Sequence, residues 1–241
     1  MRHLWSRQRQ VSRTRLAGVG VVSLLAFGLL YLVGIHTASG RWVDEALHRS
    51  LVETLPISVR QGLMLAGRLL TPLVLALVAS ALALRAVWLR RWRPVGEAVL
   101  ITVISVIAAY ALRTEWLPRV ASAVTDRNGY PSTHAAAGLS LLTAVAILWF
   151  RRPGALGRVV FGFVALLVML GNVTWQAHRP LDVIGSALLV TAVTCVVGAA
   201  SRRDGAARPP DPGGASRALP RAGAGMDESS SQLHDADLRA R

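Results

Sequence analysis

Long apolar stretches separated by arginine-rich segments constrain the fold of this chain more than any other feature. A helix that crosses a bilayer needs about 20 consecutive, mostly apolar residues. Several stretches approach or exceed that length, so we predict an all-α protein, a polytopic membrane bundle of six transmembrane helices. The six stretches cover residues 16–36, 63–87, 98–112, 135–150, 159–173 and 181–199.

The composition agrees with this prediction and narrows the classes of function. Of the 241 residues, 53% are hydrophobic, which is high for a soluble domain of this size. The net charge is +14, and a basic protein can bind nucleic acid or an anionic membrane surface. Because the arginines flank the apolar stretches, membrane topology explains them better than nucleic-acid binding does. The single cysteine, Cys195, excludes an intramolecular disulfide, and the sequence shows no cluster of metal ligands.

The arginines also predict the orientation of the bundle, because cytoplasmic loops collect arginine. They gather before the first stretch and after the second, fourth and sixth. Both termini and two loops are therefore expected in the cytoplasm. The segments expected on the extracytoplasmic side cover residues 37–62, 113–134 and 172–182.

The two ends of the chain differ from its apolar middle. Residues 1–15 form a basic cytoplasmic N-terminus, residues 16–199 the transmembrane domain, and residues 200–241 a tail with few large apolar residues, which we expect to be disordered. The first apolar stretch is longer than the about 7–15 residues of a signal peptide, which favours an uncleaved anchor. Residues 41–60 alternate apolar and charged side chains, which fits an interfacial amphipathic helix or a solvated loop helix.

The segment Tyr130-Pro131-Ser132-Thr133-His134 has the features of a helix start that faces outward. Proline is tolerated at a helix start, and serine and threonine are good N-caps. The free N–H groups at such a start suit a phosphate, and a histidine in the first turn could give a proton to a leaving oxygen. The alternative is an ordinary capped helix with an interfacial histidine.

A second histidine, His178, precedes Asp182 by four residues, so the two share one face of a helix. Asp182 could accept the Nδ1 proton of His178 and leave Nε2 with a free lone pair, as a nucleophilic or basic imidazole requires. Pro180 fits the first turn of this helix. Ionisable residues at membrane depth are costly and usually functional. The alternative is an interfacial salt bridge.

Two arginines, Arg113 and Arg119, precede the fourth apolar stretch. Arginines neutralise the oxygens of a phosphoryl group in transfer through bidentate hydrogen bonds. The alternative is that both arginines extend to the membrane interface, as arginines at helix ends often do. The predicted topology places both arginines at the same membrane face as His134, His178 and Asp182, which favours a phosphate site over coincidence.

In order and spacing, these residues resemble the three motifs of the type 2 phosphatidic acid phosphatase (PAP2) superfamily, K-x6-R-P, P-S-G-H and S-R-x5-H-x3-D. The second motif corresponds to residues 131–134. The third corresponds to residues 171–182, with Gly171-Asn172 in place of Ser-Arg. The first corresponds to Arg113 and Arg119, one residue closer together and without the proline. The similarity spans residues 113–185 and implies a PAP2-like core within the bundle.

The resemblance implies a role for each matching residue. His178 would attack phosphorus and form a phosphohistidine, and Asp182 would orient it and stabilise its charged form. His134 would protonate the leaving group and then activate water. The phosphate oxygens would be held by Arg113, Arg119, Ser132 and the backbone amides near Thr133. The resemblance implies no metal and no cofactor.

The implied function is a metal-independent phosphatase at the outer face of the cell membrane. Its substrate would be a lipid phosphate or diphosphate of the polyprenyl diphosphate, phosphatidic acid or phosphatidylglycerol phosphate class. Asn172 stands where the family has an arginine, and either Arg179 or Arg127 is a candidate to replace that charge.

Two alternatives follow from the resemblance, a PAP2-like protein that binds lipid phosphate without turnover and a phosphotransferase. A transporter is disfavoured because the ionisable residues gather at one face and not along a path through the midplane. The apolar stretches argue against the chemistry of the superfamily's soluble haloperoxidases.

Overall fold

The computed structural model describes residues 12–117, 129–149, 154–174 and 178–202, and every structural statement below concerns these residues. They are helical, and no strand occurs among them, which confirms the predicted all-α fold. Three π-helical segments, labelled η, continue neighbouring α-helices. The elements are α1 (Arg13–Leu29), η2 (Leu30–Ile35), α2 (Ala38–Thr54), α3 (Ile57–Met64), η3 (Leu65–Leu70), α4 (Thr71–Trp88), α5 (Trp92–Ala111), η4 (Leu112–Trp116), α6 (Thr133–Leu148), α7 (Ala155–Thr174) and α8 (Pro180–Ser201).

Five helical rods are long and apolar enough to cross a membrane, which is compatible with a multi-pass membrane protein. The helix that matches the fourth predicted span, α6, has only 16 residues, so the number of six spans is not confirmed and remains a prediction. The rods are Arg13–Ile35, Ile57–Trp88, Trp92–Trp116, Ala155–Thr174 and Pro180–Ser201.

The second and third rods extend beyond the apolar stretches that predicted them. The second begins at Ile57 and not at residue 63, and the third covers Trp92–Trp116 where residues 98–112 were expected. The physical reason is that the backbone hydrogen bonds of a helix continue through polar residues, whereas a hydropathy pattern ends at them.

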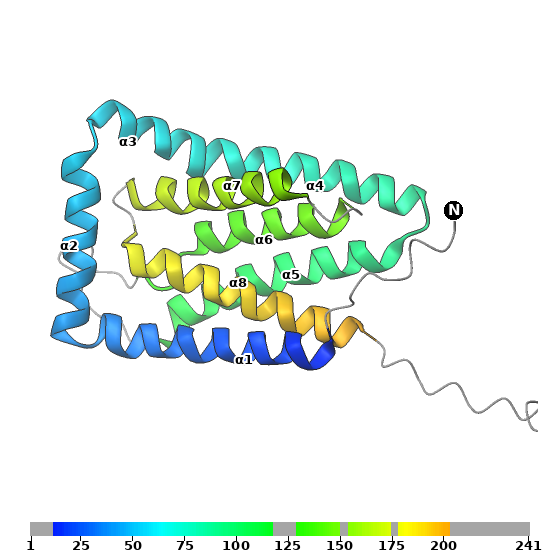
Figure 1. Cartoon of the computed structure of the whole chain (residues 1–241), viewed down its shortest axis with the longest axis horizontal. Coiled ribbons are helices and arrows are strands. Elements are labelled where there is room, and N and C mark those ends of the chain that lie inside the picture. The colour runs from blue at the N-terminus through cyan, green and yellow to red at the C-terminus, as the bar shows by residue number, and fades with distance from the viewer. Residues whose placement is uncertain (1–11, 118–128, 150–153, 175–177, 203–241) are drawn as a thin grey trace, which may run out of the picture. The chain divides into compact units, whose positions relative to one another are not determined.

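The short helix α6 lies at the centre of the bundle, with α4, α5, α7 and α8 packed around it (Figure 1). It is apolar on all sides, as a helix surrounded by other helices should be. Its buried residues include Leu139, Leu142 and Leu148. Because α6 is shorter than the rods around it, its first turn begins within the bundle and not beyond the ends of its neighbours.

The helix α2 crosses the end of the bundle between α1 and α3 (Figure 1). It begins where the Thr37 hydroxyl accepts a hydrogen bond from the Gly40 N–H at 3.0 Å. Its Asp44 and His48 side chains are buried. Neither an interfacial amphipathic helix nor a solvated loop helix, the two structures predicted for this segment, would bury them. The polar face of α2 therefore contacts protein, and α2 covers the end of the bundle at which α8 begins.

Candidate active site

Ser132 starts α6 as predicted from the sequence. Its hydroxyl oxygen accepts a hydrogen bond from the Ala135 N–H at 3.3 Å, and Thr133 is the first residue of the helix. The chain just before α6 is held in place by α1. The buried Tyr130 hydroxyl donates to the Phe27 carbonyl of α1 at 2.8 Å. The first turn of α6 is thereby anchored to a helix that comes much earlier in the chain.

The start of α6 is tied to the start of α8 by two hydrogen bonds. The Ser132 N–H donates to the Asp182 carbonyl at 3.2 Å. The Ser186 hydroxyl lies 2.9 Å from the Ser132 carbonyl and 2.9 Å from the Asp182 carbonyl of its own helix, and its one hydrogen is shared between these two oxygens. Two helix N-termini therefore lie side by side, and the positive end of a helix favours an anion.

This pairing brings the two predicted histidines together. The ring centroids of His134 and His178 are 6.5 Å apart, with an angle of 50° between the rings. The His178 side chain is buried, whereas that of His134 is exposed. Two imidazoles at this separation can contact one small ligand, and the exposed ring is the one that water or a leaving group can reach.

The predicted hydrogen bond between His178 and Asp182 is not formed. Their Nδ1 and Oδ2 atoms are 3.7 Å apart, beyond hydrogen-bonding distance, and Nδ1 has no hydrogen-bond partner among the described residues. The reason is that Asp182 also caps its own helix, since its Oδ2 accepts the Arg179 N–H at 3.0 Å. The carboxylate nevertheless lies next to His178, and such contacts often shorten only when a ligand is bound.

Close backbone packing holds the Asp182 carboxylate in place. A Cβ atom added to Gly129 would collide with Oδ2 of Asp182. One turn further along α8, a Cβ on Gly185 would lie 2.6 Å from Cζ of Tyr130. The segment before α6 therefore requires glycine at both positions in order to lie against α8.

Of the arginines predicted to bind phosphate, the structure describes some and not others. Arg113 lies in η4, is half-buried, and is close enough to His134 to interact with it electrostatically. Arg119 and Arg127 lie outside the described residues. Arg179 does not replace the missing third-motif arginine, because its Nη1 pairs with Oε2 of Glu45 on α2 at 2.6 Å.

Asp44, Glu45 and His48 of α2 form a charged layer over the start of α8. Asp44 accepts the Leu181 N–H at 3.0 Å, and burial raises the pKa of this carboxyl to about 6, although that hydrogen bond opposes the rise. Burial and the Arg179 guanidinium lower the pKa of His48. Burial raises the pKa of Glu45, but the Arg179 guanidinium outweighs it, so the net pKa is lowered.

Sequence reasoning missed three residues near this site, Asp44, His48 and Arg68. Arg68 lies in η3 and interacts electrostatically with both His134 and Arg113. A signal for it existed, because a charged residue within a long apolar stretch is costly and usually functional. Asp44 and His48 gave no such signal, since charged residues are ordinary in an amphipathic segment. Among the described residues, no three His, Cys, Asp or Glu side chains converge as metal ligands would.

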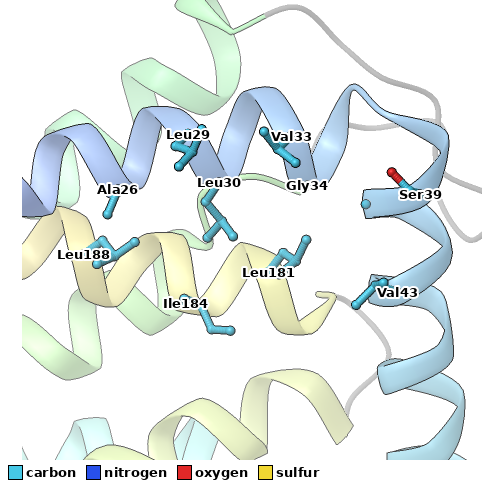
Figure 2. Close-up of a pocket in the computed structure, with 11 residues that line it drawn as sticks. Ala26, Leu29, Leu30, Val33, Gly34, Ser39, Val43, Leu181, Ile184 and Leu188 are labelled. Atoms are coloured by element: carbon cyan, nitrogen blue, oxygen red, sulfur yellow. The ribbon is translucent and has the colours of Figure 1, made fainter.

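An apolar groove of about 550 Å³ lies between α1, α2 and α8 (Figure 2). Leu181, Ile184 and Leu188 of α8 line it, and they recur at helical spacing along one stripe of that helix. Asp182 and Ser186 form a different stripe that faces Ser132. The groove and the polar site therefore lie on different faces of α8.

Fold and site together define an α-helical protein, compatible with a multi-pass membrane protein, with two histidines at paired helix N-termini. The family model described as PAP2 superfamily matches residues 69–204, more than half of the chain. This chain belongs to the PAP2 superfamily. That membership indicates phosphatase-type chemistry on lipid phosphates. Searches among curated proteins and among solved structures gave no match.

Proposed function

We propose that this protein is a metal-independent phosphatase that hydrolyses a lipid phosphate or diphosphate through a phosphohistidine intermediate. The observation that carries the proposal is the pairing of His134 and His178, whose ring centroids are 6.5 Å apart beside the first turns of α6 and α8. Helix N-termini favour an anion, and two imidazoles supply a nucleophile and an acid.

In the first step, the Nε2 lone pair of His178 attacks phosphorus while the bond to the leaving oxygen breaks. That oxygen takes a proton from His134, and phosphate remains bound to His178. In the second step, neutral His134 takes a proton from water, and the resulting hydroxide attacks phosphorus and releases His178. Asp182, 3.7 Å from Nδ1 of His178, stabilises the positive charge that the ring carries in between.

Phosphate oxygens carry the charge of the transition state, and fixed donors lower its energy. Arg113 and the N–H group of Thr133 are suited to that role, with Arg119 proposed beside them. Since the Ser132 oxygen already accepts the Ala135 N–H, its own hydroxyl hydrogen is the atom available to a phosphate oxygen.

The proposed setting is the extracytoplasmic face of the cell membrane, with both termini in the cytoplasm, residues 1–15 as the basic N-terminus and residues 200–241 as the tail. The arginine distribution supports this orientation. A lipid substrate is supported by the start of α6 within the bundle, because a lipid can leave its chains in the bilayer while its headgroup reaches that start. The substrate class is a polyprenyl diphosphate, phosphatidic acid or phosphatidylglycerol phosphate.

The test is release of phosphate from a panel of these three lipid classes by the purified full chain, without divalent metal. His178→Ala should abolish release, and His134→Ala should reduce it strongly. His36→Ala is the matched control, because His36 is also exposed but makes an edge-to-face contact with Tyr31 and none with His134 or His178 in the ring contacts of the described residues. Equal release by the wild type and His178→Ala across the panel would remove the enzyme proposal.

One observation favours a second candidate, a lipid-phosphate binder without turnover. The distance of 3.7 Å between His178 and Asp182 leaves the nucleophile without its orienting hydrogen bond in this structure. Binding of a lipid phosphate that protects the protein against thermal unfolding, with no release of phosphate, would identify this candidate.

A further inference from the structure

Arg68 is a cation within an apolar rod, and one terminal nitrogen of its side chain has no hydrogen-bond partner among the described residues. It lies in η3, inside the continuous helical segment Ile57–Trp88. Its Nη1 atom is buried and has no hydrogen-bond partner among the described residues, and no acid of those residues forms an ion pair with it. A buried guanidinium nitrogen without a partner is unfavourable, so its retention calls for an anion that binds there.

The neighbours of Arg68 are themselves basic. Arg68 interacts electrostatically with Arg113 of η4 and with His134 of α6. Three helices therefore direct positive or protonatable groups toward one region of the bundle. Neighbouring positive or protonatable groups of this kind favour a multiply charged anion such as phosphate.

Glycine packing places Arg68 beside the third motif. A Cβ on Gly171 would lie 2.7 Å from Cα of Gly67 and 2.8 Å from the backbone nitrogen of Arg68. Only two facing glycines allow η3 and α7 to approach so closely. The π-helical turn is also a common local feature of functional sites, because its extra residue redirects the side chains that follow.

Asn172, the residue after Gly171, provides no charge at this point. It is fully buried, and its Nδ2 donates to the Val168 carbonyl of its own helix at 2.8 Å. Its Oδ1 atom has no hydrogen-bond partner among the described residues. Arg68 approaches the same place from a neighbouring rod, and it lies just before residues 69–204, which the family model matches.

We propose that Arg68 binds an oxygen of the substrate phosphate and supplies, from η3, the positive charge that Asn172 lacks. This inference rests on the proposed function for its substrate, but not for the binding of phosphate itself. The chemical class of ligand is a phosphate monoester, a diphosphate or inorganic phosphate. A charged donor fixed before the reaction begins would lower the energy of the transition state.

The test compares Arg68→Gln and Arg68→Lys with the wild type in the purified full chain. Removing one oxyanion donor typically lowers kcat by about 10²–10³-fold, and we expect a loss of that order for Arg68→Gln and a partial loss for Arg68→Lys. Arg85→Gln is the matched control, because Arg85 is exposed on the same rod, and its activity should equal that of the wild type. Adding Asn172→Arg to Arg68→Gln should restore part of the activity.

Thermal unfolding separates this inference from the proposed function. Without ligand, Arg68→Gln should unfold at a higher temperature than the wild type, because an unpaired charge has been removed, whereas loss of a merely structural residue lowers that temperature. Inorganic phosphate should stabilise the wild type and Arg85→Gln, but much less Arg68→Gln.

Equal stabilisation of the wild type and Arg68→Gln by inorganic phosphate overturns the assignment of Arg68, even if His178→Ala is inactive and the phosphatase stands. If the wild type releases no phosphate from any lipid, the phosphatase fails, and the same comparison still decides the role of Arg68. Should Arg68→Gln not fold, Arg68→Lys decides, and its activity and stabilisation by phosphate must then fall below those of the wild type.

Discussion

Replacing Asp182 by asparagine separates the two roles that the structure gives this residue. As a cap, its Oδ2 accepts the Arg179 N–H at 3.0 Å. As a charge, the same oxygen lies 3.7 Å from Nδ1 of His178. At this N3 position of the capping box, an asparagine oxygen can still accept the Arg179 N–H, but it cannot neutralise a charged imidazole.

The expected loss follows from Coulomb's law. Two unit charges about 4 Å apart at an effective dielectric constant of about 20 interact with about 4 kcal/mol. Each 1.36 kcal/mol corresponds to a factor of about ten in rate, so the upper bound is about a 10³-fold loss of kcat. The Arg179 N–H already compensates part of the Asp182 charge, so we expect kcat for Asp182→Asn to fall by about 10²–10³-fold.

The assay measures both the steady-state release of phosphate and the amount of phosphohistidine formed in the first turnover. Asp182→Asn should slow phosphohistidine formation, and its free energy of unfolding should change by less than about 1 kcal/mol. Asp44→Asn is the matched control, because Asp44 is a buried carboxylate that caps the same helix through Leu181 but does not contact His178. A kcat for Asp182→Asn within threefold of the wild type refutes the charge role.

Three further substitutions test the packing and the charge layer. Gly171→Ala places a Cβ 2.7 Å from Cα of Gly67, so thermal unfolding should show a loss of about 1–3 kcal/mol together with reduced kcat; unchanged activity would contradict the close-packing argument. Gly129→Ala pushes against the Asp182 carboxylate and should lower kcat more than it lowers the melting temperature, which paired measurements on the purified variant can check. Burial raises the pKa of Asp44 to about 6, so the folded state binds that proton more tightly than the unfolded state, and the charge destabilises the fold above that pH. Asp44→Asn should therefore melt at a higher temperature than the wild type at pH 8 and converge with it near pH 4; a lower melting temperature at pH 8 would contradict the burial cost.

Local patterns were sufficient to predict the all-α fold and the start of α6. Apolar stretches marked the helices, and Ser132 ahead of an apolar run marked an N-cap, because both signals depend only on neighbouring residues. The approach of His134 to His178 was also predictable, through the side of the membrane on which arginine counting placed each loop. The predicted count of six membrane spans was not confirmed, because α6 has only 16 residues, fewer than a typical span.

Contacts that depend on how two helices pack were not predictable. Arg68 reaches the site through the Gly67–Gly171 approach and the π-helical turn, and neither leaves a periodic signal in the sequence. The spacing of His178 and Asp182 predicted a hydrogen bond, but the Arg179 N–H competes for the same carboxylate oxygen. Sequence spacing shows which groups share a face, and it does not show which donor an acceptor binds.

The distribution of charge argues for the kind of ligand that this site accepts. Near α2, carboxylates and cations balance, because Glu45 pairs with Arg179 and Asp44 caps α8. Arg68 lies about 17 Å along its rod from Ile57, at about 1.5 Å per residue, and there it interacts electrostatically with His134 and Arg113. A neutral headgroup would not offset the charge of the buried Arg68 Nη1 atom, whereas a phosphate with two negative charges would. The same argument predicts that a dianionic phosphate mimic should stabilise the protein more than a monoanion of similar size.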